Sequence, residues 1–430
     1  MMPVPLRFAI HALLLIVCLL PGLLPVTAEA APMFARKYNL SCAACHSAFP
    51  RLNSFGEQFV ASNMRLPNWR DGTLETGDQR LALPSAVPLA VRAQAYVQAR
   101  EGESIDPVTG DTVEASSDFQ SPYLIKLLSS APLSDHITYY FYGIFAEKGG
   151  NGETLIEDAW FRHDDVFASG VGLQLGQFQV SDLMFLREVR LPFQDFMVYR
   201  MAGITYDRGL LFDRGIGGLD IALGLVNGNG IDQNFDVNSP GYRRPDNMFD
   251  NNSDKSVFGR IATTLGPVSV GLFGLAGEQA NATGPAGIDS GDRDTDKRVV
   301  GLDLSGTLRG KTHWYTQLLW NTWEGFLEPD QDYDWWGGFA GVDYIFNDFW
   351  AFSALYNYAD ANDLDDTDTI YEGIDINSLS FTASYYFMRN VKGVAEVNID
   401  LLDDESRSGT FYTGHLDREG YILFGFDAAF

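Results

Sequence analysis

From Leu89 onward, polar and apolar side chains alternate with a period of two. Arg92, Gln94 and Tyr96 interleave with small or apolar residues in residues 89–100. Successive side chains of a strand point to opposite faces, so this pattern predicts strands with one polar and one apolar face. It recurs in segments of about ten residues, the length with which a tilted strand crosses a bilayer.

Sixteen such segments can be counted, and an even number is typical of a closed bacterial barrel. The predicted strands are 89–100, 119–131, 136–146, 154–163, 170–180, 203–212, 216–227, 256–265, 267–278, 297–309, 311–323, 335–346, 349–359, 376–388, 391–402 and 419–430. The chain is therefore predicted to be all-β, an antiparallel outer-membrane β-barrel with its polar faces inside.

The connections between these strands alternate in length, as short periplasmic turns and long outer loops do. Short turns are predicted at 131–135, 164–169, 213–215, 266, 310, 347–348 and 389–390, and long loops at 101–118, 147–153, 181–202, 228–255, 279–296, 324–334, 360–375 and 403–418. Aromatic clusters at strand ends, such as Trp335-Trp336 and Phe349-Trp350, fit the girdles that flank the apolar band of such barrels.

The last predicted strand places Ile422, Phe424, Phe426, Ala428 and the terminal Phe430 on one face. This face can point outward and close the barrel. A C-terminal Phe after alternating apolar residues also resembles the assembly signal of bacterial outer-membrane proteins.

Residues 1–30 have the features of an export signal. Arg7 gives a basic start, an apolar stretch follows from Ala12 to Val26, and Ala28-Glu29-Ala30 fits a cleavage site. A membrane anchor is the alternative, but the stretch is short and contains Pro21 and Pro25. A signal peptide at 1–30 would send the chain out of the cytoplasm.

Cys42-Ala43-Ala44-Cys45-His46 is the sharpest motif, because C-x-x-C-H is the attachment signature of c-type haem. Two thiols at i and i+3 share one face of a helical turn and can both reach the porphyrin, and the following His offers a ring nitrogen to the iron. A redox C-x-x-C would need a βαβ context, and a zinc site would need further Cys. We therefore expect one covalent haem c, attached through Cys42 and Cys45, with His46 as proximal ligand.

A short helical unit follows the motif. Ser54 and Glu57 fit a capping box, with Ser54 as the N-cap. Phe55 and Phe59 are helical neighbours, as are Val60 and Met64, so one face can lie on the porphyrin. We predict a signal peptide at 1–30, a small α-helical cytochrome c plug at 31–80 and a porin-like barrel at 81–430.

The sixth ligand of the iron is left open by the sequence. Met64, at the end of the capped helix, is the first candidate, because its thioether can reach the open face if the chain turns back at Pro67. Ordinary packing is the plainer interpretation of a Met there. Other candidate sulfurs are Met33, Met184, Met197 and Met201; Met248 and Met388 and the histidines at 136, 163, 313 and 415 are more distant in sequence.

Charge narrows the possible partners. The net charge of −27 disfavours nucleic acid, and 46% hydrophobic residues exclude a disordered chain. The eight long loops hold 36 acidic and 10 basic residues. Such a rim concentrates cations at the barrel mouth. Plain solubility and divalent-ion bridges to anionic lipid are equally consistent with the acidic loops.

The third long loop, residues 181–202, differs from the other long loops because it is rich in Phe and Met. We expect it to fold into the lumen.

The N-terminal motifs resemble those of the fused monohaem cytochrome c–porin family, the outer-membrane iron oxidases of iron-oxidising bacteria. The resemblance rests on Ala31-Pro32-Met33-Phe34-Ala35-Arg36, the C-x-x-C-H motif, Phe49-Pro50-Arg51-Leu52 and Phe55-Gly56-Glu57-Gln58-Phe59, about 30 residues in all. It implies a haem plug that takes electrons from extracellular ferrous iron, or another cationic donor, and passes them to a periplasmic c-type cytochrome or similar carrier.

This resemblance would make the chain an iron(II):cytochrome c-type oxidoreductase in the outer membrane of a Gram-negative bacterium, surrounded by outer-membrane lipid. Two other classes stay open. One is a diffusion porin with a haem-bearing gating or sensing plug, and the other is a haem enzyme acting on a small molecule such as a peroxide.

Overall fold

A computed structural model describes residues 33–40, 42–46, 52–66, 73–74, 76–78, 80–81, 83–84, 88–100, 103–105, 112–114, 117–146, 155–186, 190–229, 253–280, 294–328, 330–365, 375–388, 390–402 and 420–429. The predicted signal peptide at 1–30, Met248 and His415 lie outside these residues.

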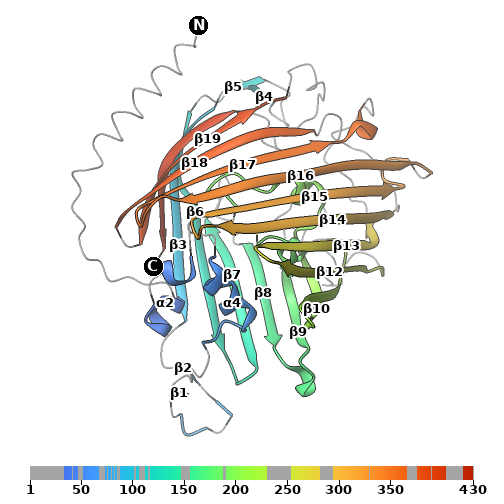
Figure 1. The fold of residues 1–430 in the computed structure, drawn as a ribbon. Coiled ribbons are helices and arrows are strands. Elements are labelled where there is room, and N and C mark those ends of the chain that lie inside the picture. Colours follow the sequence, from blue (N-terminus) through green and yellow to red (C-terminus); the bar gives the residue numbers. More distant parts are fainter. Residues whose placement is uncertain are drawn as a thin grey trace.

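Sixteen strands form one closed antiparallel barrel (Figure 1). They are β3 (Leu89–Arg100), β6 (Ser117–Pro132), β7 (Ile137–Ala146), β8 (Leu155–His163), β9 (Gly172–Gln179), β10 (Tyr206–Ile216), β11 (Leu219–Val226), β12 (Ser256–Leu265), β13 (Val268–Ala280), β14 (Asp294–Leu308), β15 (Thr312–Glu324), β16 (Asp332–Ile345), β17 (Trp350–Asp360), β18 (Ile376–Met388), β19 (Val391–Asp400) and β20 (Tyr421–Ala429). The predicted barrel and its sixteen strands are confirmed, and no strand end differs from its predicted position by more than four residues.

Each strand pairs with the next along the chain, and β20 pairs with β3 to close the ring. In the closing pair Phe424 lies opposite Val97, and Asp427 lies opposite Gln94. Two small sheets stand apart from the barrel. They are β1 (Thr73–Leu74) with β2 (Leu83–Pro84), and β4 (Glu103–Ile105) with β5 (Thr112–Glu114) in the first long loop.

The turn predicted at Asp213–Gly215 is wrong, because β10 continues through those residues to Ile216. The chain reverses at Gly217 and Gly218, whose φ angles are 60° and 87°. Two consecutive residues with positive φ match the two-residue hairpin turn that suits the twist of a sheet, and glycine adopts this conformation without strain.

Strand burial alternates as the sequence pattern predicts. In β3, Arg92, Gln94 and Gln98 are buried inside the barrel, whereas Val97 is 44% exposed on the outside. In β20, Asp427 is buried and Phe426 is 54% exposed. The outer wall is apolar and these polar side chains point into the lumen, the arrangement of a strand-built membrane protein.

The aromatic pairs at strand ends divide between the two faces. Trp336 and Phe349 are exposed on the outside, as expected for an interfacial girdle. Trp335 is 3% exposed and packs inside the barrel, so it does not belong to the girdle as the sequence suggested. The period of two sends adjacent tryptophans to opposite faces.

The N-terminal segment forms a small helical unit at the short-turn end of the barrel (Figure 1). Its helices are α2 (Met33–Tyr38), α3 (Cys42–Cys45) and α4 (Ser54–Ala61). We call its described residues, 33–40, 42–46 and 52–66, the plug. Among the described residues, no helix combines the length and the hydropathy needed to span a membrane.

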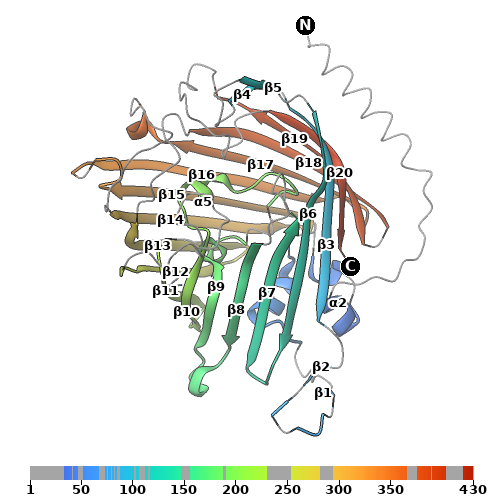
Figure 2. The ribbon, with the colours of Figure 1, turned by 180° about the vertical axis from the view of Figure 1, so that it is seen from behind.

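The third long loop folds into the lumen, as predicted. We call residues 180–205 the luminal loop; it contains the 3₁₀ helix η3 (Val180–Leu183) and α5 (Met197–Met201). Phe196 stacks on Phe339 of β16, with ring centroids 4.2 Å apart. Because β16 lies across the barrel from β9 and β10, the loop crosses the lumen (Figure 2). Burial raises the pKa of the Tyr199 phenol in this loop well above its ordinary value.

Candidate functional site

The Cys-x-x-Cys-His segment has the local geometry that the motif predicts. Residues Cys42–Cys45 form a single helical turn, and His46 follows it in a β-bridge with Leu52. The side chains of Cys45 and His46 are half-buried. This turn places the attachment residues next to the start of α4.

Asn53 joins the attachment turn to α4. Its amide nitrogen donates to the carbonyl of Ala44 at 3.0 Å, and its amide oxygen accepts from the backbone N–H of Gly56 at 2.9 Å. Asn53, and not Ser54, is therefore the N-cap of α4, and the predicted position of the capping box was wrong by one residue. Asn is among the best N-cap residues, because its side chain satisfies an orphan helical N–H.

Gly56 allows the two helices to approach each other. A Cβ at this position would overlap the carbonyl oxygen of Cys45, so the packing of α4 on α3 requires glycine here. The sequence analysis did not single out Asn53 or Gly56. For Gly56 the signal was present, since it lies within Phe55-Gly56-Glu57-Gln58-Phe59, one of the strings that carry the family resemblance.

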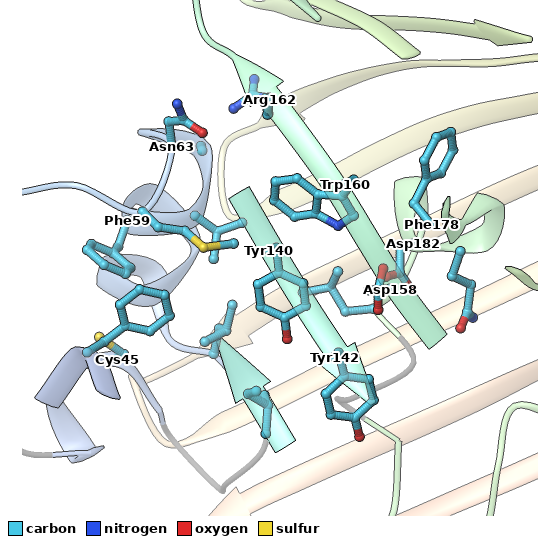
Figure 3. Close-up of a pocket in the computed structure, with 18 of the residues that line it drawn as sticks. Cys45, Phe59, Asn63, Tyr140, Tyr142, Asp158, Trp160, Arg162, Phe178 and Asp182 are labelled. Carbon is cyan, nitrogen blue, oxygen red and sulfur yellow. The ribbon is translucent and has the colours of Figure 1, made fainter. Parts of the chain in front are cut away.

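A cavity of about 500 Å³ lies between the plug, the barrel wall and the luminal loop. Figure 3 shows Cys45, Phe59 and Asn63 on one side, Phe178 and Asp182 on the other, and Tyr140 and Trp160 between them. The plug side is lined by Met33, Phe34, Tyr38, Cys45, His46, Phe59, Val60 and Met64. The size lies within the range of small-molecule and cofactor sites.

The predicted porphyrin-facing side of α4 is confirmed in part. Phe59, Val60 and Met64 line the cavity, and Phe59 is packed edge-on between Phe34 and Tyr38. Phe55 is 42% exposed and does not line it. A single helical turn separates Phe55 from Phe59, but only Phe59 lies over α2.

The barrel wall completes the cavity with aromatic side chains. Tyr140 of β7 stacks on Trp160 of β8, with ring centroids 5.3 Å apart and planes 18° from parallel. Both residues also pack against the apolar core of the plug, which contains Tyr38, Phe59 and Met64. The plug and the barrel therefore share one apolar core around the cavity.

The plug is hydrogen-bonded to the turn between β6 and β7. The Asn63 side chain donates to the carbonyl of His136 at 3.2 Å, and the Arg65 guanidinium donates to the carbonyl of Ser134 at 2.7 Å. These contacts fix the end of α4, and with it Met64, against the short-turn end of the barrel.

The candidate iron ligands separate clearly by position. His46, Met64 and Met33 all line the cavity. Met184, Met197 and Met201 are buried in the core of the luminal loop and do not line it. Met388 ends β18, and the described histidines at 136, 163 and 313 lie at the short-turn ends of strands, outside the cavity lining.

Charged groups are placed at the edges of the cavity. Arg92 makes a bidentate pair with Asp427 at 2.9 and 3.0 Å, and Arg162 pairs with Asp213 at 2.6 Å. Both arginines line the cavity, as do the carboxylates of Asp158 and Asp182. The site is thus an apolar, aromatic space with cationic and anionic groups at its margin.

The residues around this cavity fit a c-type haem. Cys45 and His46 open onto it, the walls that would cover a porphyrin are apolar and aromatic, and Met64 supplies a sulfur on the same cavity. Arg92 and Arg162 line the same cavity, each paired with an aspartate. The side chain of Cys42 lies outside the description.

No protein-family model and no curated protein matches the chain. Among solved structures, the chain is similar to porins that share 11–13% of its sequence over 80% of its length. The anion-selective porin from Comamonas acidovorans has 13% identity, 99% of its chain covered and a TM-score of 0.51. The DcaP channel of Acinetobacter baumannii has 11% identity, 97% of its chain covered and a TM-score of 0.54. OmpF of Salmonella typhi, solved with daunomycin, has 13% identity, 97% coverage and a TM-score of 0.52.

The chain has the porin fold. The closed sixteen-strand barrel and its apolar outer wall are those of a protein of the Gram-negative outer membrane. At this level of identity the likeness concerns the fold alone, because one fold can carry many functions.

Proposed function

We propose that this porin-like barrel is an outer-membrane electron-transfer protein with one covalent haem c in its plug. Ferrous iron outside the cell gives up one electron and becomes ferric iron, and a periplasmic one-electron acceptor such as a c-type cytochrome is reduced by that electron. The bound haem would supply the Fe(III)/Fe(II) couple that links the two.

The observation that carries this proposal is the shared cavity. The Cys45–His46 end of a haem-attachment motif opens onto about 500 Å³ of apolar space that the barrel wall and the luminal loop enclose. A haem-attachment motif on a solvated tail would not need such an enclosure. A group bound in this space would be shielded from water over the part of its surface that the walls cover, and such shielding is one means by which a protein sets a redox potential.

Each group of residues has a defined task in this proposal. Cys42 and Cys45 attach the haem, and His46 binds the iron on the proximal side. Met64 is the candidate distal ligand, because it lines the same cavity. Tyr140 and Trp160 pack on the plug and hold it at the barrel wall. No proton transfer is required, so no acid–base pair is needed.

Charge supports a cationic donor. The long loops carry 36 acidic and 10 basic residues in the sequence, and Asp158 and Asp182 line the cavity on the side away from the plug (Figure 3). Carboxylate oxygens are suitable ligands for hard divalent cations. A field of this sign raises the local concentration of ferrous iron at the mouth.

The test is anaerobic mixing of the purified, oxidised full-length protein with ferrous iron, followed by the haem absorption spectrum. We expect a covalent haem on a denaturing gel and spectral reduction that depends on iron concentration. A protein that carries haem but is not reduced by ferrous iron at any pH between 3 and 7 would contradict the donor, and a protein without haem would contradict the whole proposal.

A diffusion porin with a haem-bearing plug is the second candidate, favoured by the likeness to porin channels. The luminal loop and the plug both occupy the barrel, which argues against free diffusion. Single-channel recording in a planar bilayer separates the two, since an electron-transfer protein is expected to show little or no ion conductance and a diffusion porin an open channel.

A further inference from the structure

The barrel wall makes a direct contact with the candidate distal ligand. Ser130 of β6 is 1% exposed, and its hydroxyl oxygen lies 3.3 Å from the Sδ atom of Met64. The same hydroxyl lies 2.7 Å from the carbonyl of Tyr139, which anchors it on the β6–β7 hairpin. A hydroxyl has one hydrogen, and the short contact with the Tyr139 carbonyl takes it, so the Ser130 oxygen holds the Met64 sulfur by packing against it.

The backbone at Met64 is held in an unfavourable conformation. Asn63 and Met64 have φ angles of 56° and 57°, in the left-handed region. Asn tolerates this region, but for Met it is uncommon and costs energy. A conformation of this kind persists only where surrounding contacts determine it, and such residues gather at functional sites.

The contacts that determine it come from the plug and the barrel together. In the turn after α4, the amides of Asn63 and Met64 donate to the carbonyls of Val60 and Phe59 at 3.0 and 2.9 Å. The Thr138 hydroxyl of β7 donates to the carbonyl of Asn63 at 3.1 Å, and the Asn63 side chain donates to the carbonyl of His136 at 3.2 Å. Within the plug, the Tyr38 hydroxyl donates to the carbonyl of Met64 at 3.0 Å. The two residues with positive φ are therefore fixed on both sides.

We propose that the β6–β7 hairpin of the barrel, through Ser130 and Thr138, positions the Met64 thioether as the distal ligand of the haem iron. This inference rests on the proposed function, since it needs a haem bound through His46. It makes the ligation of the iron a property of the docked plug and barrel together, and not of the plug alone. Ser130 and Thr138 are positioning residues, since they act through Met64.

The experiment measures how easily imidazole displaces the sulfur in the full-length oxidised protein. The readout is loss of the sulfur-to-iron charge-transfer band as imidazole is added. Ser130→Ala removes the contact with the sulfur, and Thr138→Val removes the hydrogen bond to the carbonyl of Asn63. Each is expected to lower the imidazole concentration for half-displacement about fivefold.

Two variants serve as controls. Ser129→Ala removes the neighbouring hydroxyl of β6, which contacts the Tyr139 phenol at 2.8 Å and not Met64, and should behave as wild type. Ser130→Thr keeps the hydroxyl and should restore the wild-type imidazole titration. Heat-shifted migration on a gel confirms that each barrel has folded.

The possible outcomes distinguish a failure of the proposed function from a failure of this inference alone. If the protein carries no covalent haem, the proposed function fails and this inference fails with it. If haem is present but the wild type shows no sulfur-to-iron band, only this inference is overturned. It is also overturned if the band is present and Ser130→Ala and Thr138→Val titrate like Ser129→Ala.

Discussion

The backbone amide of Gln194, in the luminal loop, donates a hydrogen bond to the Glu396 carboxylate of β19 at 2.8 Å. The amide of Phe193 donates to the other oxygen of the same carboxylate at 3.3 Å. The Tyr421 hydroxyl of β20 lies 2.8 Å from Glu396 and 3.0 Å from the Gln194 side chain. One buried carboxylate thus ties the loop to a wall far from the strands from which the loop emerges.

Replacing Glu396 should therefore release the luminal loop. In Glu396→Ala two backbone amides lose their acceptor, at a cost of about 1–3 kcal/mol for each buried unsatisfied group. We expect higher single-channel conductance than in wild type and faster cleavage of the loop by protease. Asp343→Ala is the control, since this luminal carboxylate accepts from Ser353 of β17. Equal conductance in Glu396→Ala and Asp343→Ala would show that Glu396 does not hold the loop.

Covalent haem attachment should depend on both cysteines of the motif. Each thioether fixes one side of the porphyrin, so Cys42→Ala and Cys45→Ala should each reduce haem staining on a denaturing gel, and the double variant should abolish it. Barrel folding, measured by heat-shifted migration, is expected to persist in all three. Full-strength staining of the double variant would rule out attachment at this motif.

Gly56→Ala should disturb the attachment turn without a change in any haem-binding residue. The added Cβ would overlap the carbonyl oxygen of Cys45, and overpacking of this kind costs about 1–3 kcal/mol. We expect a lower yield of covalent haem per barrel, measured by staining against total protein. Gln58→Ala changes an exposed position of the same helix and should leave the yield unchanged. Equal yields from both variants would remove the role assigned to Gly56.

Met64→Leu should remove the sulfur-to-iron charge-transfer band and lower the haem midpoint potential, because a Met ligand raises the potential. Leucine keeps about the same volume in this buried site, which limits the loss of packing. Met184→Leu is a matched control, since Met184 is buried but lies outside the cavity lining. If the band survives Met64→Leu, the same substitution at Met33 identifies whether the other cavity sulfur is the ligand.

The acidic residues of the long loops should affect the rate at which ferrous iron is captured and should leave the haem spectrum unchanged. Changing Asp365, Asp366 and Asp368 together to Asn should slow reduction by ferrous iron roughly two- to tenfold at low ionic strength, and less at high salt, because screening removes the steering field. Asp363 is left in place, since it accepts from the backbone of Asp334 at 2.9 Å. A stopped-flow rate that is the same in variant and wild type at every salt concentration would make the rim a solvating surface only.

The sequence predicted the architecture in considerable detail. The period of two sets which side chain of each strand faces the lipid, and this local property does not depend on the partner strand. The sixteen strands and the luminal path of the third loop could therefore be inferred in advance, as could the helical turn at Cys42–Cys45. The turn was wrongly placed at Asp213–Gly215, two residues before the Gly217-Gly218 pair at which the chain reverses.

The side chains that surround the candidate site could be identified only from the tertiary structure. The sequence made Met64 the first candidate and left Met33 on an equal footing with the luminal-loop methionines. The fold brings Met64 and Met33 to the cavity and buries the others elsewhere. Ser130 lies 66 positions from Met64 along the chain, and Glu396 lies 202 from Gln194. The hydrophobic pattern of the sequence does not reveal such pairs, because closure of a barrel brings residues together whatever their separation in sequence. The strand pattern by itself determined which faces meet lipid and lumen, and only the tertiary structure decided which side chains meet one another across the lumen.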